Sequence, residues 1–464
     1  MRTVDGVDLR SLTTSLRGPV FTRDDDGYDV ERAGFQTARW HRPDLIVGAT
    51  GPADIRAAVS FAADQGLPVG VQGTGHAVLA VAAAEGVLIN TRRMRGVRVN
   101  SQTGTAWLGA GVRWDQVIHE AAQFGLAPLS GSAPHVGAVS YILGGGLGLL
   151  SRRYGYAADH VRSLDVVTAD GELRHVTARF DPDLFWALRG GRDNFGIVTG
   201  LEIDLMPVER FYGGSMTFDL DEAAEVVEAY VQWTEFVPDE LSSSIALISF
   251  PDAATVPPRL RGRRIVQIRI AYLGGAEAGE RLVAPLRAIA TPTIDTLAEL
   301  PYSAAGTIHN DPVEPVPTEG DNLMLGPLGI EAAATLFDLV RSGAPVPHVV
   351  ELRHLGGALA CRPAAGNAIG HRSAHFVLVL ATRSDMADAD VIRYAHTELL
   401  HTFSRWSAGG QMLNFMTGER GAQHVRNGYD PEDYQRLATL KSRYDPANIF
   451  RLNHNIPPVA LTSE

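Results

Sequence analysis

The first two hundred residues alternate short apolar runs with amphipathic stretches, a pattern that predicts alternating strands and helices. Residues 45–49 form an apolar run typical of a buried strand. Pro52 then opens a helix, because proline is tolerated at the first helical position, and Gly66 ends it. Residues 67–71 form the next strand. This strand–helix–strand unit places the loop that follows at a strand end, where α/β proteins bind ligands.

A second unit of strands and a helix is expected next, and the pattern changes only after about Pro207. Residues 87–89 and 106–108 alternate like strands, and residues 114–124 carry their apolar side chains on one helical face. After about Pro207, longer strands separated by helices are typical of an α+β domain with helices on one sheet face. The strands expected there are residues 265–272 and 375–380, the helices are residues 221–236, 276–289, 330–341 and 389–406, and residues 312–317 form a surface loop.

The amino-acid composition argues against several classes of protein. The 464 residues carry a net charge of −12, which argues against a nucleic-acid-binding protein. No apolar run reaches the roughly 18 residues of a membrane span, and we expect a cytoplasmic protein. Cys361 is the only cysteine, which excludes an internal disulfide and a multi-cysteine metal or iron–sulfur site. Lys441, the only lysine, lies in a polar segment, which argues against Walker A and Schiff-base chemistry.

The most informative motif is Gly73-Thr74-Gly75-His76, directly after the apolar run 67–71. A buried strand that leads into a glycine-rich turn presents a set of backbone N–H groups suited to a phosphate anion. The histidine at the tip lies beside whatever the phosphates carry. The motif therefore suggests a flavin dinucleotide held by its pyrophosphate and tethered through the imidazole.

Three further segments have the character of ligand-contacting backbone. Residues 144–148 contain four glycines in five positions, which is incompatible with a stable helix interior and allows close approach to a ligand. Residues 183–199 place glycines beside Asn194 and a β-branched strand. Residues 444–457 interleave asparagines with apolar residues, and the amides of Asn453 and Asn455 share one side if that segment is extended.

These four elements, in this order, resemble the flavin-dependent oxidases of the vanillyl-alcohol oxidase superfamily, whose FAD-binding domain is of the PCMH type. The more similar branch is the berberine-bridge-enzyme-like one, which includes bacterial hydroxynicotine oxidases and oxidases of antibiotic pathways. The resemblance covers nearly the whole chain and implies an α+β fold. It implies a two-part FAD-binding domain at residues 1–206, a substrate domain with a helix-covered antiparallel sheet at residues 207–408, and a C-terminal segment, residues 409–464, that returns to the FAD domain.

The resemblance also implies roles for individual residues. His76 stands where the family attaches the flavin covalently. Many members attach it a second time through a cysteine, and Ala133 stands at that position, so a single tether is expected. Val136 falls where the family controls oxygen access to the ring. The other implied cofactor contacts are the pyrophosphate loop (Val71, Gln72, Gly73, Thr74, Gly75 and Ala77), the flavin lining (Gly137, Ala138, Ser140 and Tyr141), the adenine contacts (Ile197 and Val198), and Asn453 or Asn455 on the ribityl chain.

The catalytic base is harder to place. Carbohydrate-type members carry a tyrosine after an asparagine near the tail, but this chain has Asn414-Phe415, and phenylalanine cannot take a proton. On the expected strand 349–354, Glu351 and Arg353 share one face and His354 lies opposite. Either Glu351 or His354 is a candidate base beside the substrate. The alternative is a solvated sheet face or a Glu–Arg pair, and a neutral amine substrate needs no base.

The sequence thus predicts an FAD-dependent oxidase, with no metal site. It would transfer hydride from a small alcohol, hemiacetal, phenol or amine to a tethered flavin that O2 reoxidises to hydrogen peroxide, within secondary metabolism. Two alternatives stay open: a flavin-dependent dehydrogenase or oxidative cyclase that does not use O2, and a flavoprotein that binds a ligand without turnover. The expected partners are a small-molecule substrate and O2, without nucleic acid or membrane, and the oligomeric state is open.

Overall fold

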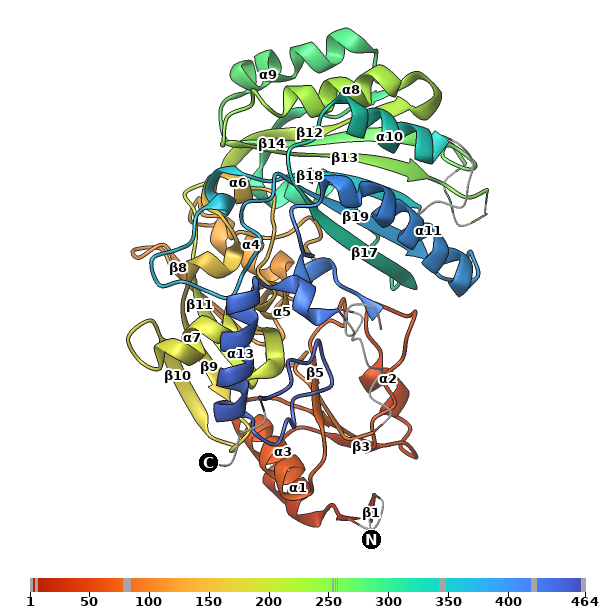
Figure 1. Cartoon of the computed structure of the whole chain (residues 1–464). Coiled ribbons are helices and arrows are strands. Elements are labelled where there is room, and N and C mark those ends of the chain that lie inside the picture. The colour runs from red at the N-terminus through yellow and green to blue at the C-terminus, as the bar shows by residue number, and fades with distance from the viewer. Residues whose placement is uncertain are drawn as a thin grey trace.

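The computed structural model describes residues 3–4, 7–77, 85–252, 254, 256, 258–341, 348–418 and 424–459. The fold is α+β, as predicted, with two sheets in the lower half of Figure 1 and one large sheet in the upper half. The N-terminus lies at the bottom, beside α1 (Arg10–Ser15), and the short strands β1 (Thr3–Val4) and β2 (Val7–Asp8) pair there. Within the described residues, every helix is too short or too polar to cross a lipid bilayer.

The first sheet has four strands in the order β3-β4-β6-β5. Strands β4 and β5 both run parallel to β6, and β3 is antiparallel at the edge. Helix α3 (Pro52–Asp64) connects β4 to β5 and buries Ile55 and Val59 against the sheet, as the apolar spacing predicted. The strand bounds are Val20–Thr22 for β3, Leu45–Gly48 for β4, Val69–Gln72 for β5 and Val87–Asn90 for β6, and α2 (Tyr28–Arg32) lies beside them.

The second sheet has five antiparallel strands in the order β10-β9-β11-β8-β7. The elements expected to form a second unit are therefore divided: β6 belongs to the first sheet and β8 to the second. Helices α4 (Trp114–Ala122), α5 (Ala138–Leu143) and α6 (Ser151–Tyr154) follow β8 in the chain. The strand bounds are Val97–Asn100 for β7, Thr105–Gly109 for β8, Val161–Val167 for β9, Leu173–Thr177 for β10 and Ile197–Asp204 for β11.

The large sheet is antiparallel and runs in the order β15-β12-β14-β13-β18-β19-β17, with β16 also on β12. Four helices cover its outer face (Figure 1): α8 (Ala224–Trp233), α9 (Ala276–Ile289), α10 (Ile330–Arg341) and α11 (Ala389–Phe403). The strand bounds are Arg210–Asp219 for β12, Leu241–Ser249 for β13, Arg264–Tyr272 for β14, Ile294–Asp295 for β15, Ala298–Pro301 for β16, Thr318–Leu325 for β17, Val349–His354 for β18 and Phe376–Arg383 for β19.

The two faces of this sheet differ in chemistry because side chains alternate along each strand. Ile245, Ile268 and Leu352 lie on the helix side, in one apolar core. Ser244 and Arg269, whose neighbours in the chain belong to that core, belong to the opposite face, which points toward the lower half of the molecule. The face that meets the other sheets thus carries polar residues on its central strands, beside apolar residues such as Phe211 and Val377 that pack into the core of the lower half.

The C-terminal helix α13 (Pro431–Tyr444) returns to the lower half and packs against α7 (Pro182–Leu188) (Figure 1). Lys441 lies on its buried face, so the prediction of a polar setting was wrong. Its ammonium donates to Asp445 Oδ2 at 2.6 Å and to the carbonyls of Asn194 at 2.7 Å and Phe450 at 2.9 Å. All three protons are used, so this amine fastens the C-terminal segment and is not free for chemistry.

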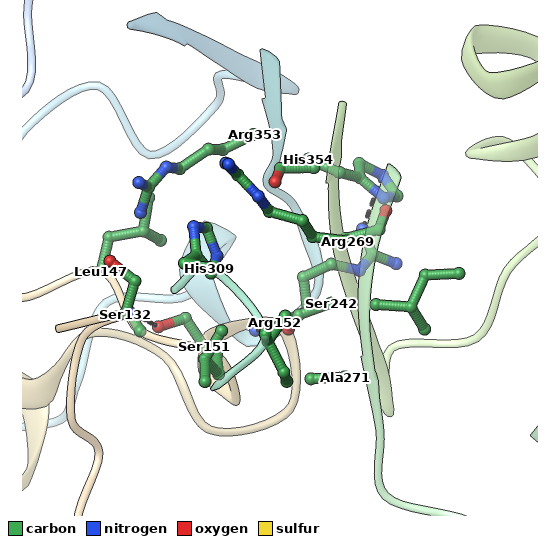
Figure 2. Close-up of a pocket in the computed structure, with 16 residues that line it drawn as sticks. Ser132, Leu147, Ser151, Arg152, Ser242, Arg269, Ala271, His309, Arg353 and His354 are labelled. Carbon is green, nitrogen blue, oxygen red and sulfur yellow. Dashed lines mark hydrogen bonds between the residues drawn. The ribbon is translucent and has the colours of Figure 1, made fainter. Parts of the chain in front are cut away.

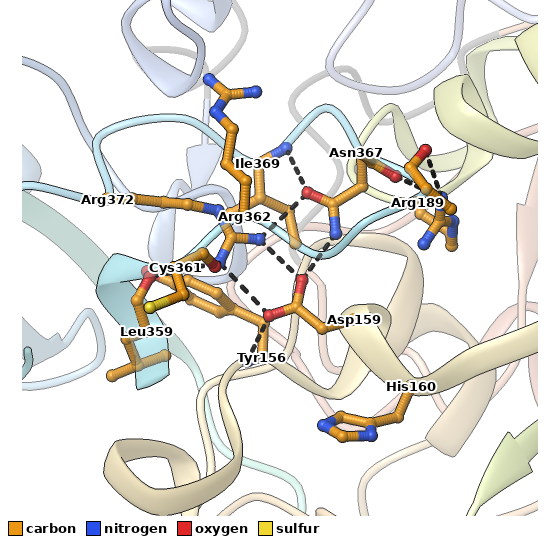
Figure 3. Close-up of polar contacts among 12 residues, drawn as sticks. Tyr156, Asp159, His160, Arg189, Leu359, Cys361, Arg362, Asn367, Ile369 and Arg372 are labelled. Carbon is orange, nitrogen blue, oxygen red and sulfur yellow. Dashed lines mark hydrogen bonds and ion pairs between the residues drawn. The ribbon is translucent and has the colours of Figure 1, made fainter. Parts of the chain in front are cut away.

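A buried polar cluster joins the two halves (Figure 3). Asp159, in the 3-10 turn η1 (Ala157–His160), accepts hydrogen bonds from Arg372 Nη2 and Asn367 Nδ2, both at 2.6 Å. Tyr156 donates its backbone N–H to the same carboxylate at 3.0 Å. Since residues 355–375 connect β18 to β19, the cluster holds that connection against the segment that follows the glycine-rich residues 144–148.

Candidate active site

Three neighbouring cavities lie between the sheets. The segment Gly73-Thr74-Gly75-His76 lies beside the first of them. This cavity, of about 680 Å³, is called the nucleotide cavity after the contacts predicted for it, and it lies between the end of β5, the start of α5 and the start of β11. It is lined by Val71, Gly73, Thr74, Ala77, Gly137, Ser140, Ile197 and Val198, all predicted cofactor contacts, and by Thr91, Ala110, Gly111, Val139, Leu143, Arg192 and Asp193.

The loop after β5 is held by its own backbone. Gly75 has φ +70°, and a Cβ there would lie 2.5 Å from Gly34 Cα, so only glycine fits. The carbonyl of Thr74 accepts the N–H of Phe35 at 3.0 Å. Thr74 Oγ1 accepts the N–H of Gly137 at 3.1 Å, which ties the loop to the start of α5.

His76 is fixed at the tip of this loop. Its ring stacks on Phe35 with centroids 4.1 Å apart, and Nδ1 shares a 2.8 Å hydrogen bond with Thr74 Oγ1. Burial, His135 and Arg113 lower the pKa of His76 to about 3, so the imidazole is neutral. Nε2 is buried and has no hydrogen-bond partner among the described residues. The result is a rigid, uncharged imidazole with one unengaged nitrogen.

The central cavity, of about 800 Å³, begins at His76. Of the predicted residues, Val136, Tyr141 and Phe415 contribute to its wall. Asn414 lines it too, but its Oδ1 accepts Gly146 N–H at 2.9 Å and its Nδ2 donates to the Tyr141 carbonyl at 3.0 Å. Its amide therefore positions the glycine-rich segment. The full lining is His76, Ala77, Gly131, Ser132, Val136, Ser140, Tyr141, Leu147, Arg192, Arg353, Asn414, Phe415, Met416 and Thr417.

Several predicted cofactor contacts line neither cavity: Gln72, Gly75, Ala133, Ala138, Asn453 and Asn455. Gln72 Nε2 instead donates to the carbonyls of Arg32 and Ala33, both at 3.2 Å, and so supports the loop from behind. The amide oxygens of Asn453 and Asn455 are buried without a hydrogen-bond partner in the described chain. The ribityl contact predicted for these two residues thus stays a prediction.

A third cavity, which we call the arginine cavity, has a volume of about 460 Å³ and shares Ser132, Leu147 and Arg353 with the central one (Figure 2). It lies against the polar face of the large sheet. Its remaining lining residues are Gly148, Leu149, Ser151, Arg152, Ser242, Ser243, Ser244, Arg269, Ile270, Ala271, Ile308, His309 and His354.

Glu351 is not placed to act as a base. Its carboxylate is buried and receives Arg269 Nη1 at 2.8 Å, Arg353 Nε at 3.0 Å and Ser244 Oγ at 2.7 Å. Burial alone would raise the pKa of Glu351, but Arg353 and Arg269 hold it far below its usual range. The Glu–Arg pair considered from the sequence is the arrangement found, and the carboxylate stays ionised.

His354 is also an unsuitable base, which corrects the second prediction for this strand. Its Nε2 accepts a hydrogen bond from Arg152 Nη1 at 2.7 Å, and its ring stacks on Phe376. Burial and the Arg152 charge lower the pKa of His354 to about 3. The nitrogen that would take a proton is already engaged.

Three arginines and one histidine of these cavities were missed: Arg152, Arg192, Arg269 and His309. Arg192, at φ +55°, lines both the nucleotide and central cavities, and its Nη2 donates to the Leu413 carbonyl at 2.7 Å. The two glycines directly before Arg192, Gly190 and Gly191, were the sequence feature that could have indicated this position. Arg269 and Gln267 interrupt the apolar run of residues 265–271, which was the available signal for that strand. His309 lies in a loop, and no sequence pattern distinguishes it.

Comparison with known proteins agrees with this geometry. A family model described as FAD binding domain matches residues 43–177, and one described as Berberine and berberine like matches residues 412–457. The (R)-6-hydroxynicotine oxidase of Paenarthrobacter nicotinovorans is 29% identical over 96% of this chain and 97% of its own length. An uncharacterised FAD-linked oxidoreductase of Bacillus subtilis, YgaK, is 27% identical over 96% and 98%.

Solved structures show the same fold. The crystal structure of 6-hydroxy-D-nicotine oxidase from Arthrobacter nicotinovorans superposes with a TM-score of 0.82 at 26% identity, covering 95% of this chain and 98% of that one. Xylooligosaccharide oxidase from Myceliophthora thermophila gives a TM-score of 0.84 at 20% identity, covering 97% and 99%. The two family models and these relatives together support a berberine-bridge-enzyme-like FAD-linked oxidase of the PCMH superfamily.

Proposed function

We propose that the protein is an oxidase whose FAD is attached covalently through His76 alone, and that it oxidises a small alcohol, hemiacetal, phenol or amine. The observation that carries the proposal is the position of His76: its neutral imidazole lines the central cavity beside Ala77, which lines both cavities, and its Nε2 is unengaged by the described residues. The hydroxynicotine oxidase relative supports the oxidase assignment.

The residues present fit FAD. Backbone around Gly73, Thr74 and Gly137 lines the nucleotide cavity and suits a pyrophosphate, while Arg192 adds a positive charge shared with the central cavity. Ala133 has no sulfur, so His76 would be the single attachment. When bound, FAD accepts a hydride from the substrate and passes two electrons to O2, which becomes hydrogen peroxide.

The chain itself supplies the orientation of the substrate. Val136 and Tyr141 form part of the wall of the central cavity, and Val136 would set oxygen access there. Since the carboxylate of Glu351 and Nε2 of His354 are both engaged, neither would take the substrate proton. We place the protein in the cytoplasm, where a reducing environment suits the exposed, unpaired Cys361, and in secondary metabolism.

Acid precipitation of the purified protein tests the tether. The wild-type pellet is expected to stay yellow and the His76→Ala pellet to be colourless. His135→Ala is the matched control: the His135 ring lies 4.9 Å from that of His76 but is not the proposed attachment site, so its pellet should stay yellow. A colourless wild-type pellet from protein produced with ample FAD would contradict the proposal.

Turnover assays separate the oxidase from the alternatives. Substrate oxidation in air should release one hydrogen peroxide per substrate. Flavin bleaching by substrate without O2, combined with no peroxide in air, would indicate a dehydrogenase or an oxidative cyclase. A flavin that no alcohol, phenol or amine of a broad panel bleaches would indicate a ligand-binding flavoprotein.

A further inference from the structure

The arginine cavity contains an uncommon row of side chains on the polar face of the large sheet. Ser244, on β13, pairs directly with Arg269 of β14 on one side and with Arg353 of β18 on the other. The three therefore stand in one line across three strands, and the two guanidinium groups flank a serine. Figure 2 shows Arg269, Arg353 and His309 directed toward the same space.

The charges around this space do not balance. Arg269 and Arg353 share a single carboxylate, Glu351, and their side chains are 8% and 17% exposed. A third guanidinium, Arg152, is paired with the exposed Asp239 at 3.1 Å. Burying a guanidinium without a counter-ion is costly, so one positive charge in this cavity lacks its partner.

The other ionisable groups near the cavity do not supply that partner. No carboxylate lines it among the described residues. Asp311 is not part of the lining, and its Oδ2 accepts a hydrogen bond from the lining residue Ser132 at 2.6 Å. His354 is neutral, and burial together with Arg269 lowers the pKa of His309, so the histidines add no charge at neutral pH.

Arg269 and Arg353 also have hydrogen-bond donors that are not used within the described chain, as an anion-binding site requires. Arg269 uses Nε on Gln267 and Nη1 on Glu351, and Arg353 uses Nε on Glu351, while their remaining nitrogens have no partner in the described chain. Arg353 also lies over the ring of Phe415, at 4.9 Å, on the side of the central cavity. The His309 ring is 5% exposed, and its Nδ1 has no hydrogen bond within the described residues, since Glu351 Oε1 is 3.8 Å away.

We infer that the substrate of this enzyme carries a carboxylate, which binds between Arg269 and Arg353 with His309 beside it. This inference rests on the proposed function and adds the class of substrate. Guanidinium groups match a planar carboxylate well, because their N–H groups form paired, charge-assisted hydrogen bonds. Since Arg353 lines both cavities, the carboxylate would occupy the far end and the carbon to be oxidised would lie in the central cavity, toward His76.

Binding of simple aromatic probes to the holoenzyme tests this, followed by the visible flavin absorption and by calorimetry. Benzoate is expected to bind at least about tenfold more tightly than benzyl alcohol or benzylamine, as one charge-assisted contact predicts. Arg269→Met and Arg353→Met should each weaken benzoate about tenfold. Glu351→Gln should tighten it, because it removes the competing negative charge. A merely structural arginine pair would not produce this opposite effect.

Arg210→Met is the matched control: Arg210 belongs to the same sheet but pairs with Glu299 at the exposed edge, so benzoate binding should not change. Thermal unfolding checks that every variant is folded. Equal binding of the three probes, or unchanged binding in both arginine variants, would overturn the inference. Tighter binding of para-nitrophenolate or inorganic phosphate than of benzoate would also overturn it. Calorimetry needs neither flavin nor turnover, so failure of the flavin tether is recognised separately.

Discussion

The protonation states of His76 and Glu351 are set by the residues around them. His76 is neutral and has one unengaged nitrogen because it is buried against Phe35 and lies near His135 and Arg113. Glu351 keeps its charge, although it is buried, because two arginines surround it. The same residue types on an exposed strand would be ordinary solvated groups.

Lys441 gives a direct test at this scale. Lys441→Met leaves the Asp445 carboxylate buried without its cation, and we expect a loss of about 3–5 kcal/mol in the free energy of unfolding. Urea denaturation measures it. The double variant Lys441→Met/Asp445→Asn should recover part of the loss, because no buried charge is left unpaired. A single variant within about 1 kcal/mol of wild type would contradict the assigned clamp.

The sequence predicted residue types better than residue partners. The face shared by Glu351 and Arg353 followed from strand alternation, and the strand that carries Arg269 was also recognised. Arg269 contacts Glu351 only because β14 and β18 both pair with β13 in a particular register. No local sequence pattern determines that register. Lys441 was misjudged for the same reason: its burial arises from packing between α13 and residues far away in the chain.

Among the elements, the loop after β5 has the strictest requirements. It must follow a parallel strand, turn through a positive φ at Gly75 and pass against Gly34. Those requirements explain why glycine and a β-strand signal together were informative in the sequence. The five-stranded sheet was less predictable, since its strand order joins segments that are far apart in the chain.

Gly66 and Gly75 have similar positive φ angles but different surroundings, so their substitutions can be compared directly. Gly66→Ala, at φ +66° with open space around it, should cost only about 1 kcal/mol. Gly75→Ala, at φ +70°, places a methyl group against Gly34 and should displace the loop. We expect flavin content to fall strongly in Gly75→Ala and to stay near wild type in Gly66→Ala, as absorbance ratios report. Equal flavin content in both variants would show that the loop does not shape the cofactor site.

At the scale of the whole molecule, the site exists only because separate sheets and the C-terminal segment meet. The central cavity takes its wall from His76, from Arg353 on the large sheet and from residues 414–417 near the tail. The fold class and this return of the tail were predicted through the family resemblance. The arginine cavity was not, because His309 and Arg152 reach it from loops and short helices.

Acid should destabilise the folded protein. Burial and Arg192 lower the pKa of His454 to about 3, from 6.5 in the unfolded chain. Between these values the unfolded state binds the extra proton, so stability is present above about pH 6.5 and falls as the pH falls toward 3. His454 alone should account for about 2 kcal/mol between pH 7 and pH 5. Urea midpoints measured at the two pH values test this, and a His454→Gln variant with the same acid dependence as wild type would contradict it.

The most direct test of the account is the intact mass of the denatured protein, measured for wild type and His76→Ala after production with ample FAD. The account predicts a wild-type polypeptide heavier than its sequence by one FAD and a variant at the bare sequence mass. A wild-type chain at the bare mass, or a variant that retains the added mass, would contradict the central claim that the His76 imidazole holds the flavin.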